Sequence, residues 1–150
     1  MADSVSVRID GLDELRAELR RMNTTAEAVV EDAAKQTAVA VRARAIRSIN
    51  KGPASGIIYP AVINVRGTVH QASAPGQPPM ADTGRLANSI KWEQDSKGYV
   101  VGTAVDYGLF LEAGTSTMKP RPWLVPAVEA ELPKFRERLV KAIRRLGGGG

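Results

Sequence analysis

The stretch SVSVRID at residues 4–10, followed by GLDELRAELRRMNTTAEAVVEDAAKQTAVAVRARAIRSIN at 11–50, changes from one hydrophobic period to another. Val5, Val7 and Ile9 alternate with polar residues, which is the pattern of a half-buried strand. After this strand, apolar residues recur in steps of three and four, which predicts an amphipathic helix. These apolar positions are Leu12, Leu15, Leu19, Met22, Ala26, Val29 and Ala33. We therefore expect the fold to begin with one strand and a long helix.

The predicted helix over 12–50 either continues unbroken or restarts near Thr24. Residues 23–25 are Asn-Thr-Thr, which are poor helix formers, and Thr24 with Glu27 has the spacing of a capping box. The second half of the helix is rich in alanine, which allows another helix or subunit to approach closely. Packing against the protein's own sheet is the expected use of that face.

Residues 51–83 form a long loop rich in proline and glycine, which excludes a long helix. Val62, Ile63 and Val65 could pair with Val69 in a short hairpin. A long loop inside a small domain is usually functional or disordered. We expect an arm that binds a partner, with plain disorder as the alternative.

The next segment predicts an antiparallel hairpin over 88–103, with a turn at 96–98. A short turn should lead from 82–84 into this hairpin. Asp106 is then placed to cap a short helix over 107–113, which the glycine at position 114 would end.

A C-terminal helix is expected from Pro122, because proline is tolerated in the first turn. Pro133 should kink this helix or split it into 122–131 and 133–146. The glycines at 147–150 are expected to form a disordered tail.

These elements predict an α+β fold: a small antiparallel sheet packed against a long N-terminal helix and a C-terminal helix, with a long Pro/Gly-rich loop. The chain has 150 residues, which suits one domain, here placed at 1–146 with 51–83 as its arm. No signal peptide or membrane-spanning run is recognisable, so no membrane partner is expected.

Catalysis and cofactor binding are not expected. The chain has no cysteine, which excludes disulfides, thiolate nucleophiles and Cys-ligated zinc. The single histidine, His70, lies in the loop with no acidic residue within ten positions, so a catalytic triad or a metal site has no local support. No segment has the spacing of a calcium loop, a phosphate loop or a dinucleotide fingerprint.

The positive charge is concentrated in the last helix. The net charge is +5, and residues 132–150 hold six basic residues and one acidic residue. Four basic residues fall on one stripe of the helix, with apolar residues on the other side: Lys134, Arg138, Lys141 and Arg145. This stripe is a solvated face, a contact for an acidic protein, or a contact for DNA phosphates.

Two motifs support a more specific interpretation. The first is ASAPGQPP at 72–79, followed by DTGRL at 82–86 and SI at 89–90. The second is YGLFLEAGT at 107–115, followed by PRPWL at 120–124. In this order, behind a strand and a long helix, they resemble the tail-completion, or head–tail joining (neck), proteins of long-tailed bacteriophages and gene transfer agents. The resemblance covers residues 5–146.

The resemblance implies a non-enzymatic virion protein that assembles as a ring, expected to be a hexamer, after synthesis in the host cytoplasm. Its partners would be its own copies, the tail tube or terminator proteins and the head connector proteins, with DNA in the channel as a further contact. The alternatives are a tail terminator, a minor head connector, or, in another class, a double-stranded DNA-binding protein that uses its C-terminal helix.

The motif residues expected to form the fold or an interface are Asp82, Thr83, Gly84, Arg85, Leu86, Tyr107, Glu112, Gly114, Thr115, Arg121, Pro122 and Trp123. Tyr107, with Phe110 or Leu111, should anchor the short helix on the hairpin. Glu112 could pair with Arg121, and Trp123 should fill the core where the last helix begins.

Overall fold

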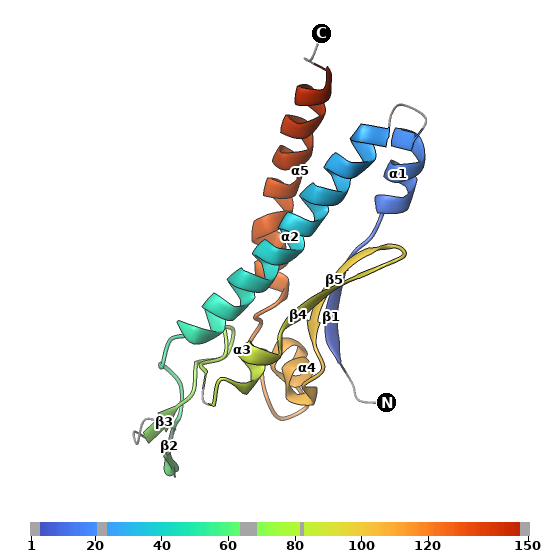
Figure 1. Cartoon of the computed structure of the whole chain (residues 1–150). Helices are drawn as coiled ribbons and strands as arrows, with labels where there is room; N and C mark the ends of the chain where they lie inside the picture. The colour runs from blue at the N-terminus through green and yellow to red at the C-terminus, as the bar shows by residue number, and fades with distance from the viewer. Residues whose placement is uncertain (1–3, 21–23, 64–68, 82, 148–150) are drawn as a thin grey trace.

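The protein is a three-stranded sheet covered on one face by a long helix (Figure 1). The computed structural model describes residues 4–20, 24–63, 69–81 and 83–147. The sheet has the order β1 (Val5–Ile9), β5 (Gly98–Thr103) and β4 (Lys91–Asp95), with antiparallel pairing throughout. The α+β prediction is confirmed, including the hairpin and its turn.

The first helical segment is two helices, α1 (Leu12–Arg20) and α2 (Thr24–Asn50). The helix therefore restarts at Thr24, as one of the two alternatives predicted. The two helices form a hairpin in which α2 runs back over the sheet (Figure 1). Arg16 of α1 pairs with Glu31 of α2, so a part-buried ion pair joins them.

The Pro/Gly-rich segment contains a two-stranded antiparallel ribbon, β2 (Ile58–Ile63) and β3 (Val69–Gln71). The ribbon extends beyond the end of α2, away from the three-stranded sheet (Figure 1). A hairpin was expected here from Val62, Ile63 and Val69; Val65 lies outside the described residues.

Two short helices correct the prediction for the second half of the chain. Residues expected to turn directly into a strand form α3 (Arg85–Ser89), because Gly84 adopts a left-handed φ of 74° and its carbonyl accepts the Asn88 N–H at 2.9 Å. The other, α4 (Asp106–Ala113), has Val105 at its N-cap, so Asp106 is the first helical residue rather than the cap. Gly114 ends α4 as predicted, with its N–H bonded to the Phe110 carbonyl.

The C-terminal helix α5 spans Val125–Gly147, so it starts later than predicted and is continuous. Pro133 lies inside it and removes one backbone hydrogen bond without ending the helix. Ala127 before Pro133, and Phe135 and Leu139 after it, pack against the same core, so both halves of the helix are held there. Gly147 belongs to α5; the predicted disordered tail otherwise lies outside the described residues.

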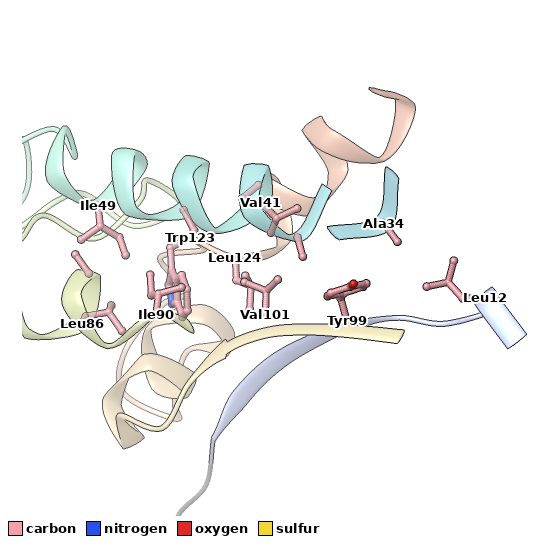
Figure 2. Close-up of a cluster of buried hydrophobic side chains, with 14 of the residues drawn as sticks. Leu12, Ala34, Val41, Ile49, Leu86, Ile90, Tyr99, Val101, Trp123 and Leu124 are labelled. Atoms are coloured by element: carbon pink, nitrogen blue, oxygen red, sulfur yellow. The ribbon is translucent and has the colours of Figure 1, made fainter. Parts of the chain in front are cut away.

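The core lies between α2 and the sheet, and Figure 2 shows it from the side. On α2, Val41 lies above Val101 of β5, and Ile49 lies above Leu86 of α3 (Figure 2). Trp123 enters between these layers from the segment before α5 (Figure 2), and it is 1% exposed. Its predicted core position is therefore confirmed.

Candidate docking site at the junction of two motifs

The structure brings the two sequence motifs together at one end of the core. The Arg121 Nε donates to the Ser73 carbonyl at 3.1 Å, and the Gly76 N–H donates to the Pro120 carbonyl at 2.8 Å. Segments almost 50 residues apart in sequence are thus joined directly. We call this region, formed by the described parts of residues 72–90 and 107–127, the motif junction.

Glu112 caps the start of α5 instead of pairing with Arg121. Its carboxylate accepts the backbone N–H groups of Trp123, Leu124 and Val125 at 2.8, 2.9 and 2.9 Å. The predicted Glu112–Arg121 pair is therefore wrong. A helix N-terminus has N–H groups without intrahelical partners and a positive dipole end, and this carboxylate satisfies both.

Arg121 instead positions the loop before α5. Its backbone N–H donates to the Leu111 carbonyl at 2.6 Å, while its guanidinium contacts the Ser73 carbonyl and, at 3.5 Å, the Met118 sulfur. Thr115 supports the same loop, because its hydroxyl accepts the Met118 N–H at 3.0 Å. Gly114 makes the required turn with a φ of 76°.

A pocket of about 410 Å³ opens at the motif junction. Predicted motif residues line it, together with parts of α2 and the arm. Those motif residues are Thr83, Gly84, Arg85, Leu86, Tyr107 and Arg121. Glu112, Gly114, Thr115, Pro122 and Trp123 lie outside the lining, and Asp82 lies outside the described residues.

The contact between α4 and the sheet depends on Gly108, which the sequence reasoning did not single out. A Cβ at this position would lie 2.7 Å from the Thr103 Cγ2 atom, so only glycine allows this approach. The Gly108 carbonyl also accepts the Trp123 Nε1–H at 3.1 Å. Of the residues expected to anchor α4, Leu111 packs against the core, whereas Tyr107 and Phe110 are exposed.

The basic stripe of α5 lies toward α2 rather than away from it. Arg138 donates to the Thr37 hydroxyl at 2.9 Å, and its other terminal nitrogen lies 3.6 Å from Glu131. Lys134 donates to Glu131 at 2.9 Å. Lys141 and Arg145 are exposed beside a groove that also includes Asp32 of α2. Two of the four stripe residues are therefore engaged within the fold.

Glu131 is the buried centre of this charge cluster. Its side chain is 5% exposed, and Arg44 of α2 also donates to it at 2.9 Å. Burial alone would raise the pKa of Glu131, but hydrogen bonds from Lys134 and Arg44 outweigh this effect and lower the pKa. The carboxylate is therefore ionised in the folded protein and joins α2 to α5.

Replacing Glu131 should make the free energy of unfolding depend less on pH in the acidic range. A carboxyl whose pKa falls on folding stabilises the native state above its ordinary value of 4.5, and this contribution is lost as the pH falls through the folded-state pKa. At pH 7, we expect Glu131→Gln to lower the free energy of unfolding by about 1–2 kcal/mol, because its partners can still be solvated. Urea denaturation between pH 7 and 3 should show the difference from wild type shrinking below pH 4.5.

The exposed Glu129 on the same helix provides the control. Glu129→Gln should change the unfolding free energy by no more than about 0.5 kcal/mol. A difference between wild type and Glu131→Gln that stayed constant down to pH 3 would contradict the assigned role of Glu131.

The outer side of α5 carries exposed apolar residues. Val125, Leu132, Val140 and Ile143 are each more than 40% exposed. Val125, Leu132 and Ile143 fall within about 20° of one another at 100° per residue. We call these four residues the α5 apolar face. Other apolar residues of this helix, such as Phe135 and Leu139, pack against the core.

The described residues show neither a cluster of metal ligands nor a membrane-spanning helix. They contain no group of three or more His, Cys, Asp or Glu side chains arranged to hold a metal ion. Within the same ranges, each helix is too short or too polar to cross a membrane.

Comparison with known proteins agrees with the resemblance. Residues 13–114 match the family described as "Bacteriophage HK97-gp10, putative tail-component". The match covers more than half of the chain, from α1 to the end of α4, and leaves α5 outside. No curated protein and no solved structure matches the chain. The chain therefore belongs to the HK97-gp10-like family of phage tail components, structural proteins of the virion.

Proposed function

We propose that this protein completes the phage tail and joins it to the head. It assembles as a ring, expected to be a hexamer, between the tail tube and the head connector, and it acts by docking rather than by catalysis. Membership of a tail-component family carries this proposal. The order of the two motifs supports the head–tail junction as the location.

Two exposed apolar regions support assembly into a ring. One is the α5 apolar face, and the other is formed by Ile57 and Ile58 at the base of the arm, which are 66% and 57% exposed. The C-terminal end of α5 and the arm lie at opposite ends of the molecule (Figure 1). Two different patches, one along α5 and one at the arm, suit a heterologous, head-to-tail contact, which closes into a ring when the rotation allows it. Exposed apolar surface of this kind commonly marks a protein interface.

Electron microscopy of particles made with this gene disrupted tests the joining role. We expect DNA-filled heads and separate tails of uniform length, which purified protein should rejoin into infectious particles. Tails of uncontrolled length would favour the tail-terminator alternative, and heads that lose their DNA would favour a minor head connector. Intact particles would refute a role at the junction.

A variant of the α5 apolar face tests the contact surface. Val140→Asp with Ile143→Asp should leave the fold intact, because both side chains are 47% exposed, but should abolish rejoining. The matched control is Glu137→Gln, an exposed polar position on the same helix, which should rejoin heads and tails as wild type does. Full activity of the double variant would exclude this face from the assembly.

DNA contact through α5 remains the alternative of another class. Its support is the exposed basic end of the helix, with Lys141, Arg144 and Arg145. The engagement of Lys134 and Arg138 by Glu131 leaves fewer cations for phosphates. A steep fall of duplex affinity with rising salt, weakened by Lys141→Gln, would support it, since each neutralised phosphate adds to the slope.

A further inference from the structure

The pocket at the motif junction has the form of a binding site. Its volume of about 410 Å³ lies within the range of ligand pockets. Its apolar lining comes from α2, the arm, α3 and α4: Ile49, Met80, Leu86, Tyr107 and Leu111. Met80 and Tyr107 are each 37% exposed, so part of this lining is open to solvent.

An unpaired hydroxyl group lies in the wall of this pocket. Ser73 is 1% exposed, and its Oγ atom has no hydrogen-bond partner among the described residues. A buried polar group without a partner carries a free-energy penalty, so such groups are rare in native proteins. The Ser73 carbonyl is engaged by Arg121, so the backbone of this residue is fixed while its buried hydroxyl has no partner among the described residues.

Among the described residues, the charged part of the lining has one sign. Arg85 and Arg121 both line the pocket, and none of the lining residues that the structure describes carries a carboxylate. Beyond its contacts with the Ser73 carbonyl and the Met118 sulfur, Arg121 has further N–H groups, since a guanidinium has five. A ligand with an apolar group and a neighbouring carboxylate would complement this combination of walls.

We propose that this pocket binds a peptide segment of another protein, in which a bulky apolar side chain stands next to a carboxylate. The apolar side chain fills the pocket beside Met80, Leu86 and Leu111. The carboxylate pairs with Arg85 or Arg121, and the Ser73 hydroxyl gains a hydrogen bond. The inference rests on the proposed function for the source of the segment, which would be a neighbouring protein of the particle.

NMR titration of the full chain with N-acetyl-phenylalanine tests the pocket directly. We expect saturable shifts of the backbone amides of Ser73, Leu86 and Ala87. N-acetyl-phenylalanine amide has the same ring and no carboxylate, and it should bind at least about threefold more weakly. An absence of shifts, or equal affinity for the two probes, would overturn the proposal.

Two variants separate the polar contributions. Arg85→Gln should remove the preference for the carboxylate, and Ser73→Ala should weaken binding of both probes without lowering the melting temperature. Lys91→Gln on the exposed strand β4 is the control and should bind as wild type does. Unchanged binding by both pocket variants would overturn the assignment of these groups.

Varying the protein concentration tests the other possible occupant of the pocket, a second copy of the chain. If these same amides shift on dilution of the protein without a probe, a second copy of the chain fills the pocket, and the proposed partner is wrong. The titration measures the pocket alone, whereas the rejoining of heads and tails measures the junction role. Failure of one proposal is therefore distinguishable from failure of the other.

Discussion

Trp123→Ala should lower the free energy of unfolding by about 3–5 kcal/mol, the cost of removing a large side chain from a packed core. The indole is 1% exposed and lies between α2 and the sheet (Figure 2). Its removal leaves a cavity and also leaves the Gly108 carbonyl without its donor. Because native domains are stable by only about 5–15 kcal/mol, urea denaturation followed by circular dichroism should show a large shift of the midpoint.

The second tryptophan of the chain provides the matched control. Trp92 on β4 is half-buried. The Lys35 Nζ atom and the centre of the Tyr99 ring each lie 5.8 Å from the centre of the Trp92 ring. Trp92→Ala should cost about 1–2 kcal/mol, since much of the ring is already in contact with solvent. Equal losses for the two variants would show that Trp123 does not hold the layers together as described.

The elements predicted from local periodicity are largely those that the structure contains. The alternation of Val5, Val7 and Ile9 identifies β1, because successive side chains of a strand point to opposite faces and one of these faces is more buried. The turn at 96–98 is similarly local, since the Asp95 carboxylate accepts the N–H groups of Lys97 and Gly98. Such signals depend on neighbours in sequence, so the sequence alone contains them.

The errors concern contacts between distant segments. Helical spacing places the basic residues of α5 on one stripe, but it does not say whether this stripe or the opposite side of the helix faces α2. The buried Glu131 orients the helix, because its carboxylate forms ion pairs with Arg44 of α2 and with Lys134 and Arg138 of α5. Likewise, α3 forms where a short turn into the strand was expected, because burial of Leu86 and Ala87 against the core favours a helical turn.

The sequence identifies the two motifs but not the geometry in which they meet. The two motifs identify residues that gather at one pocket, which sequence spacing could not show. Ser73 and Gly108 are the residues that sequence reasoning missed, since a serine or glycine in a loop or short helix is unremarkable until its neighbours are known. The proline at position 122 indicated the start of α5 too early, because the cap is a side chain from α4.

Glu112→Ala tests that cap, and we expect it to lower the free energy of unfolding by about 2–3 kcal/mol. Hydrogen bonds to a charged acceptor are stronger than neutral ones, and three backbone N–H groups lose their acceptor together. Water can replace part of the loss at Val125, which is 46% exposed, but not at Trp123 and Leu124, which are buried. Chemical denaturation of wild type and variant at pH 7 measures the difference.

Graded substitutions at Glu112 separate the cap from general effects of losing a side chain. Glu112→Gln keeps one carbonyl oxygen and should lose roughly half as much stability as Glu112→Ala, because a neutral acceptor is weaker. Glu129→Ala on α5 removes the same type of side chain from an exposed site and should cost no more than about 0.5 kcal/mol. If Glu112→Ala were as mild as Glu129→Ala, the start of α5 would be fixed by the burial of Trp123 and Leu124 alone. If the cap is needed, the late start of α5 at Val125 follows from the reach of one carboxylate on α4.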